Sequence, residues 1–266
     1  MVMSLLERNF NRKHWSQANA DHDAQKGEKM KDRGYQRNLI AGAIGALGML
    51  LGDLSLSLVE PGAEDAGLFL REAYLQGGYP AWKLVFLLIS GMIGVFGYWF
   101  GLKAVHASLD DRCKKTKCCF RYCSMIYCFT GLAIHFGIGA GAYMTSYVAA
   151  NIGRDAAISM ATEYAAHIVP AFYIAYPAMG FLFLSLLVMT AGEKTIYSKK
   201  MLLVQPIIWM AVGALMPDIK QALGCRMYTL DYVITQSSGN FAPFIYFLAC
   251  LLLPESFKMK KARICK

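Results

Sequence analysis

Several stretches of this sequence are apolar for longer than a strand or an ordinary core helix requires. The clearest are residues 38–60, 82–106 and 164–190, and a run of roughly 18 apolar residues or more is typical of a helix that crosses a bilayer. Lipid offers no hydrogen bonds, so such a run satisfies its backbone groups only as a helix. Composition agrees, because 56% of the 266 residues are apolar and 17% are charged, against about 45–50% and 25% in soluble domains. We therefore predict an integral membrane protein, which excludes a soluble enzyme, a disordered regulator and a disulfide scaffold.

Six segments are predicted to span the membrane. They cover about residues 38–60, 82–106, 122–150, 164–190, 202–222 and 239–256. Pro206, Pro217 and Pro243 lie in or at the ends of the last two segments, where we expect kinks because proline removes a backbone donor. The predicted fold is all-α: a bundle of six transmembrane helices over residues 38–256, with a polar basic segment at 1–37 and a basic tail at 257–266.

Basic residues are unevenly distributed between the loops. Eight Lys and Arg precede residue 38, six lie in 103–121, three in 191–200 and five in the tail, so 22 of the 27 fall on one side of a six-helix bundle. Short cytoplasmic loops are enriched in Lys and Arg. We therefore predict that the protein lies in the cell membrane with both termini in the cytoplasm. The first outer loop is acidic instead, with Glu60, Glu64, Asp65 and Glu72. The same distribution explains the net charge of +9 without a nucleic-acid partner.

Ionisable and amide side chains within the apolar segments are the candidate functional residues, because burying them in lipid is costly. Asp53 lies fifteen residues into the first segment, about 22 Å deep at 1.5 Å per residue. Similar counting places the other members in the outer half of the bundle or near its midplane. The full set is Asp53, His135, Tyr143, His167, Asp218 and Asn240. We predict that these residues line a polar cavity that opens to the outer face.

Three interpretations of this cavity remain open. The first is a site that binds, senses or transports a small molecule or lipid, since a carboxylate near an imidazole can bind a cation or relay protons. The second is a metal-dependent hydrolase acting on a lipid, with Asp53, His135, His167 and Asp218 as a zinc set. The third is that each polar group only hydrogen-bonds to a neighbouring helix. No HExxH motif and no nucleophile elbow is present.

Glycine pairs four residues apart recur in the first three segments. They are Gly48 and Gly52, Gly97 and Gly101, and Gly137 and Gly141. Small residues at this spacing let helix backbones approach closely in lipid. We therefore expect the first three helices to pack tightly.

Five cysteines gather in the second cytoplasmic loop and the start of the third segment. They are Cys113, Cys118, Cys119, Cys123 and Cys128. A reducing cytoplasm disfavours disulfides. Free thiols, reversible palmitoylation, and a zinc or redox site without the usual CxxC pairing are the alternatives.

Some of these residues also carry a resemblance. Gly52-Asp53 lies late in the first segment, Tyr197 precedes a segment with Pro206 and Pro217, and Gly239-Asn240 opens the last. With the order of segments, this pattern resembles an uncharacterised bacterial family of small polytopic membrane proteins, a domain of unknown function. The resemblance covers residues 38–256. It implies a multi-pass protein of the bacterial plasma membrane with lipid contacts and no assigned activity, and it adds weight to Asp53 and Asn240.

The charge distribution predicts the side of the membrane on which the chain ends. A fluorescent reporter fused after Lys266 should be active in the cytoplasm, and an alkaline phosphatase fused there should be inactive. A control fusion in the acidic loop at residue 62 should give the opposite pair of results. An active phosphatase at the C-terminus would contradict the predicted orientation.

Overall fold

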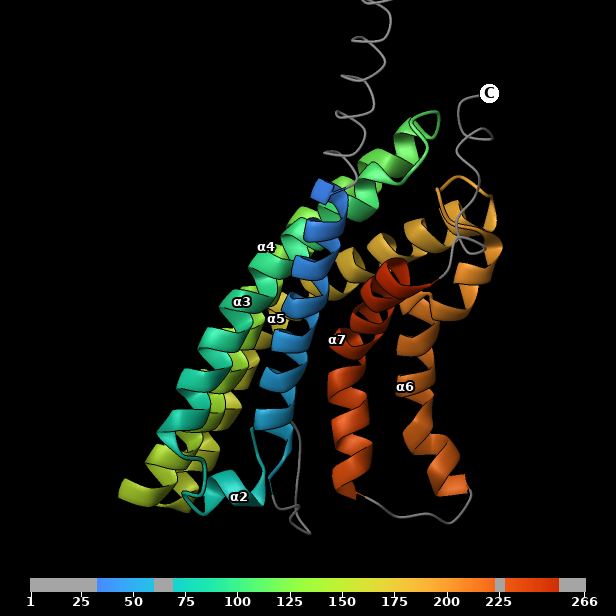
Figure 1. Cartoon of the computed structure of the whole chain (residues 1–266). Helices are drawn as coiled ribbons and strands as arrows, with labels where there is room; N and C mark the ends of the chain where they lie inside the picture. Colours follow the sequence, from blue (N-terminus) through green and yellow to red (C-terminus); the bar gives the residue numbers. More distant parts are fainter. Residues whose placement is uncertain (1–32, 60–68, 223–227, 254–266) are drawn as a thin grey trace, which may run out of the picture.

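The computed structural model describes residues 33–59, 69–222 and 228–253, and this part of the chain contains helices and no strand (Figure 1). The long helices are the N-terminal helix Arg33–Ser57, α3 (Ala81–Ala107), α4 (Lys114–Asn151), α5 (Arg154–Ala191), α6 (Pro206–Ala222) and α7 (Tyr228–Leu252). Two short helices join them, α2 (Glu72–Leu75) and the 3-10 helix η1 (Lys199–Val204). The predicted all-α class is confirmed for the described residues.

Five helices in the described residues are long and apolar enough to cross a membrane. They are the N-terminal helix, α3, α4, α5 and the segment Lys199–Met216, which joins η1 to α6. The described apolar part of α7, Ser237–Leu252, is shorter than each of these five helices. A membrane protein is thus supported, while the sixth span and the placement of the termini stay predictions. The polar segment before Arg33, the acidic loop at 60–65 and the tail at 257–266 lie outside the described residues.

Large apolar side chains on the outside of the bundle agree with a lipid environment. Phe129 is 72% exposed, Tyr173 75% and Phe181 58%, with many others on the same helices. Monomeric soluble proteins rarely expose contiguous apolar surface on this scale. In a bilayer these side chains contact acyl chains instead of water.

Three helices begin eight or more residues earlier than the apolar segments predicted. α4 starts at Lys114, α5 at Arg154 and α7 at Tyr228, where the sequence predicted 122, 164 and 239. Polar and charged residues interrupt the apolar pattern in the added turns, so a criterion of apolar length misses them although such residues are compatible with a helix. Pro206 is the first residue of α6, after Gln205 in an extended conformation. At this position a proline lacks only an N–H that would have no helical partner.

Successive long helices run in opposite directions (Figure 1). The N-terminal helix leads down to α2, α3 returns, and α4, α5, α6 and α7 alternate in the same way. The start of the N-terminal helix at Arg33 and the end of α7 at Leu252 consequently lie towards the same end of the bundle (Figure 1). This is the arrangement that an even number of spans requires.

The N-terminal helix and α3 touch backbone to backbone at glycines. A Cβ added to Gly45 would lie 2.6 Å from the Cα of Gly97, and one added to Gly42 would lie 2.7 Å from the Cα of Gly101. No side chain fits at these distances, so the predicted role of Gly97 and Gly101 in close helix packing is confirmed. Gly141 instead makes room for the ring of Phe69, and Gly137 for the side chain of Ile168. The Gly137–Gly141 pair therefore allows close side-chain packing and not a backbone contact.

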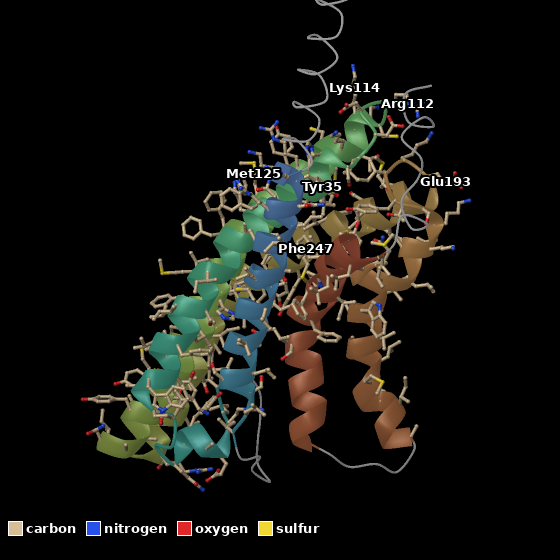
Figure 2. All side chains as sticks on the ribbon, viewed as in Figure 1. Tyr35, Arg112, Lys114, Met125, Glu193 and Phe247 are labelled. Carbon is tan, nitrogen blue, oxygen red and sulfur yellow. The ribbon has the colours of Figure 1, made fainter. Side chains whose placement is uncertain are left out.

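α7 packs against the same glycine contact. The ring of Phe247, labelled in Figure 2, is 1% exposed. It lies over Gly42 and Gly101. It also contacts the ring of Tyr98 on α3, with centroids 6.0 Å apart. The main core continues from here to Leu182 and Phe183 of α5. One apolar core therefore joins the N-terminal helix, α3, α5 and α7.

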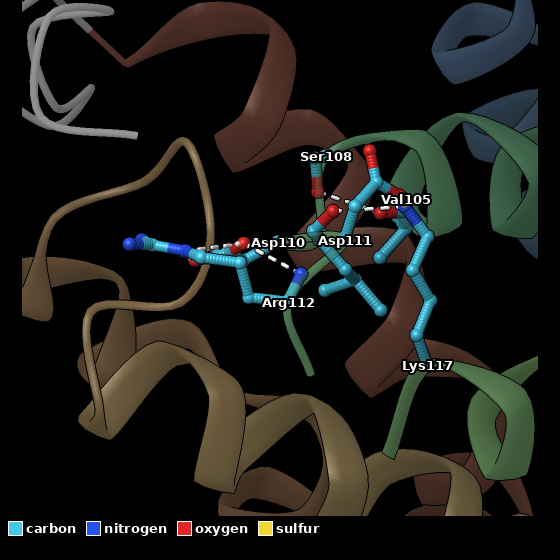
Figure 3. Close-up of polar contacts among 7 residues, drawn as sticks. Val105, Ser108, Asp110, Asp111, Arg112 and Lys117 are labelled. Atoms are coloured by element: carbon cyan, nitrogen blue, oxygen red, sulfur yellow. Dashed lines mark hydrogen bonds and ion pairs between the residues drawn. The ribbon is translucent and has the colours of Figure 1, made fainter. Parts of the chain in front are cut away.

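Two loops close the bundle at the end where the described chain starts and finishes. The residues after α3 pair with those after α5 through a bridge between Leu109 and Thr195 and a hydrogen bond from the Asp110 N–H to the Lys194 carbonyl. The Asp110 carboxylate accepts hydrogen bonds from the guanidinium and the backbone N–H of Arg112 (Figure 3). These bonds, the side-chain ones foremost, lower the pKa of Asp110 to about 2. The Tyr35 and Tyr197 hydroxyls hydrogen-bond to each other below these loops.

The opposite end is closed by α2. The Tyr74 ring is fully buried and its hydroxyl donates to the Leu56 carbonyl at 3.0 Å. Glu72 accepts two 2.8 Å hydrogen bonds from Arg154 at the start of α5, and these bonds lower the pKa of Glu72. α2 thereby ties the end of the N-terminal helix to α5.

The glycine contact predicts that a Gly→Ala substitution lowers the stability of the protein far more at position 97 than at position 180. Gly97→Ala places a methyl group 2.5 Å from the Cα of Gly45, and overpacking of this kind costs about 1–3 kcal/mol. Gly180→Ala on α5 meets nothing within 4 Å, so its stability should be unchanged or slightly raised by the better helix propensity of alanine. Thermal unfolding of both variants in one detergent measures the difference. Equal midpoints would contradict the close contact.

Candidate functional site

Asp53 and Asn240 form a direct polar contact between the N-terminal helix and α7. The Asn240 Nδ2 donates to the Asp53 Oδ2 at 2.6 Å. On its other side, the Asn240 Oδ1 accepts from the Tyr98 hydroxyl of α3 at 3.0 Å. The amide therefore uses a donor and an acceptor at once, which is the role for which an asparagine is suited and an aliphatic residue is not.

His135 of α4 joins this contact from the other side of Asp53. Its Nδ1 lies 3.5 Å from the Asp53 Oδ1, and the residue is 7% exposed. Its Nε2 is buried and has no hydrogen-bond partner. One nitrogen thus faces the carboxylate and the other is unsatisfied, which is costly in a dry interior.

Two glycines make the space that the His135 ring occupies. A Cβ on Gly91 of α3 would lie 2.7 Å from the imidazole Cδ2, and a Cβ on Gly52 would collide with Nε2. The ring is therefore clamped between the N-terminal helix and α3. Because Gly52 has no side chain, the imidazole can approach the helix that carries the Asp53 carboxylate.

Together, Asp53, Tyr98, His135 and Asn240 are called the polar cluster below. They come from four helices and meet inside the bundle: Tyr98 is 1% and Asn240 9% exposed. Three of the four are sequence-predicted site residues. Tyr98 is the member that the predicted set did not include.

The other predicted site residues lie elsewhere. His167 is on the exposed side of α5, where its Nδ1 is 2.8 Å from the Glu163 carbonyl. Asp218 is exposed on α6. Tyr143 is half-buried and packs against the apolar cluster around Tyr74. Its ring is tilted against that of Tyr147, with the ring centroids 6.2 Å apart.

Within the described residues, no three His, Cys, Asp or Glu side chains are grouped so that they could hold a metal ion. Of the four residues in the zinc set of the hydrolase interpretation, Asp53 and His135 are brought together. His167 and Asp218 are not brought to them.

A cavity of about 500 Å³ lies between the N-terminal helix, α6 and α7. Its walls are mostly apolar: Leu50, Leu54, Trp209, Val212, Gly213, Met216, Ser237, Ser238 and Phe241. Leu54 directly follows Asp53, and Phe241 directly follows Asn240. The buried Ser237 Oγ has no hydrogen-bond partner. An apolar space with a few polar groups at its edge is the usual form of a small-molecule site.

A second hollow of about 610 Å³ lies on the outer face of the N-terminal helix and α3. It is lined by apolar residues, among them Ile44, Ile93 and Phe96. All three of these side chains are exposed, so the hollow faces the surroundings of the bundle. It has no link to the polar cluster and is the kind of groove that acyl chains fill.

Comparison with known proteins places the chain in a family. A model described as "Family of unknown function (DUF6796)" matches residues 30–256. The chain belongs to this family. The match spans the whole bundle, including every member of the polar cluster, and agrees with the resemblance to a domain of unknown function seen in the sequence. No curated protein and no solved structure matches the chain, so membership in DUF6796 brings no activity with it.

Proposed function

We propose that this DUF6796 protein binds an amphipathic small molecule or lipid inside the membrane. The apolar part of the ligand would occupy the cavity between the N-terminal helix, α6 and α7, and its polar group would face Asp53, Asn240 and Ser237. The observation that carries the proposal is the adjacency of a 500 Å³ apolar cavity to a buried carboxylate–amide pair.

The chemistry of the walls supports an amphipathic ligand over an ion or a sugar. Trp209, Val212, Met216 and Phe241 offer mainly dispersion contacts, which suit the apolar part of a ligand that comes from the membrane. A small hydrophilic solute would lose its hydration there with little in return. The polar groups at the edge are few, which suits a single headgroup or amine.

The proposed orientation follows from charge and depth. The predicted topology, six spans with both termini in the cytoplasm, would put Asp53, near the end of the N-terminal helix, in the outer half of the membrane. The binding site would then be reached from the outer leaflet.

Transport and sensing are extensions of the same proposal, because a ligand between the N-terminal helix and α7 would compete with the contacts that hold these helices together. The hydrolase interpretation lacks a comparable observation, since the described residues offer only Asp53 and His135 of its zinc set.

A cavity-filling substitution tests the proposal. Val212→Trp adds bulk in the wall of the cavity, and Leu215→Trp makes a comparable change at a 56% exposed position outside the wall on the same helix. The proteins are purified in a mild detergent, and bound molecules are extracted and identified by mass spectrometry. We expect one discrete amphiphile with wild type and Leu215→Trp. Its amount should fall about tenfold in Val212→Trp, the loss that about 1.4 kcal/mol of binding free energy produces.

Thermal unfolding of each variant separates lost binding from lost folding. The proposal is contradicted if correctly folded wild type carries only bulk membrane lipids, in proportions that Val212→Trp does not change. Asp53→Asn, which keeps the size of the side chain and removes its charge, should lower retention of the same amphiphile.

A further inference from the structure

The hollow on the outer face of the N-terminal helix and α3 is long enough for one acyl chain of a lipid. Two small residues, Ala41 and Gly97, line it together with larger apolar side chains. Along α3 the lining residues run from Ile89 to Phe100, which corresponds to roughly 16 Å of helix at about 1.5 Å per residue. Half of a hydrocarbon core of about 30 Å has nearly the same thickness. The hollow therefore extends over about one leaflet of a bilayer.

Two basic residues lie in line with the hollow at one of its ends. Arg37 is four residues before Ala41, and Lys103 is three residues after Phe100. Residues three or four apart share one face of a helix, so each basic residue continues the face that lines the hollow. Both residues are exposed.

The glycine contact brings these two residues to nearly the same level of the bundle. Gly42 lies against Gly101, and the two helices run in opposite directions (Figure 1). Counted from this contact towards the same end of the bundle, Arg37 is five residues away on its helix and Lys103 two residues away on its own. The difference is about 4.5 Å along the helix axis. Long Arg and Lys side chains can therefore meet at one phosphate group.

We propose that this hollow, with Arg37 and Lys103 at its end, binds one anionic glycerophospholipid from the adjoining leaflet. One acyl chain lies in the hollow, and the phosphate accepts hydrogen bonds from the Arg37 guanidinium and the Lys103 ammonium. Basic groups between transmembrane helices are suited to acidic lipid headgroups. The site is separate from the cavity between the N-terminal helix, α6 and α7, and does not depend on the ligand proposed for that cavity.

The distribution of acidic residues favours an anionic lipid over a zwitterionic one. α3 contains no Asp or Glu, and the one acidic residue of the N-terminal helix is Asp53, about 24 Å along the helix from Arg37. In the loop after α3, Asp110 and Asp111 already accept hydrogen bonds from basic side chains. These two helices thus offer no carboxylate beside the phosphate that could hold the amine of a zwitterionic headgroup.

Native mass spectrometry of the full-length protein measures this binding. Delipidated protein in detergent is titrated with dioleoylphosphatidylglycerol or with dioleoylphosphatidylcholine, and wild type should bind the first phosphatidylglycerol more tightly. Arg37→Gln combined with Lys103→Gln should weaken that binding about 30-fold, or roughly fivefold for each basic residue near an acidic lipid, and should abolish the preference. As a control, Lys114→Gln combined with Lys115→Gln removes two exposed charges from the start of α4, which does not line the hollow. This control should bind as wild type does.

The apolar part of the site is tested with tryptophan substitutions. Ile93→Trp fills the hollow, and Ile174→Trp places the same side chain at a 60% exposed position of α5. Only Ile93→Trp should weaken the binding of phosphatidylglycerol. Val212→Trp, in the wall of the other cavity, should leave it unchanged. Binding that depended on Val212 and not on Arg37 and Lys103 would assign the lipid to that cavity and overturn the present proposal.

Photo-crosslinking of wild type guards against a variant that fails to fold. A phosphatidylglycerol with a diazirine in one acyl chain should label the peptides that contain Ile44 and Ile93. Excess unlabelled phosphatidylglycerol should suppress this labelling, and phosphatidylcholine should not. The proposal is also overturned if wild type binds both lipids equally, if the control at Lys114 and Lys115 loses as much binding as the variant at the hollow, or if labelling spreads evenly over the exposed helix faces.

Discussion

The hydrogen bond from Asn240 to Asp53 is the polar interaction on which the arrangement of this bundle depends. Neither water nor lipid is at hand to replace it inside the membrane, so each partner needs the other. Asn240 in turn orients the Tyr98 hydroxyl, and Asp53 lies beside His135. Four helices thereby acquire a fixed mutual position at one level of the bundle, and two of them, the N-terminal helix and α7, also line the cavity.

Glycine makes this polar contact possible. Gly45 and Gly97 bring the N-terminal helix against α3, and Gly52 and Gly91 leave the slot in which the His135 imidazole lies. Larger residues at these points would separate the helices by more than the reach of a short carboxylate or amide. Apolar packing and the polar cluster are therefore two consequences of the same close approach. Within the polar cluster, the buried Nε2 of His135 lacks a hydrogen-bond partner and lies against Gly52.

The sequence predicts much of this from general rules of membrane chemistry. Apolar length gives the N-terminal helix, α3, α4 and α5, and the cost of buried polarity points to Asp53, His135 and Asn240. Depth along a helix does not give rotation about its axis, so His167 and Asp218 were predicted at the same level although their side chains face outwards. Asp231, Gln236 and Ser237 interrupt the apolar run before residue 239, so the first turns of α7 were not predicted. Tyr98 and Gly91 become recognisable only when the neighbouring helix is in place.

A double-mutant cycle on Asp53 and Asn240 tests the central contact most directly. The free energy of unfolding in detergent is measured for wild type, Asp53→Ala, Asn240→Ala and the double variant. If the two side chains stabilise each other as described, the coupling free energy should be about 0.6–1.7 kcal/mol, the range from the average to the largest value for hydrogen bonds between membrane helices. Effects that add within about 0.3 kcal/mol would show that the residues act independently, and the account of a bundle organised by this contact would then be wrong.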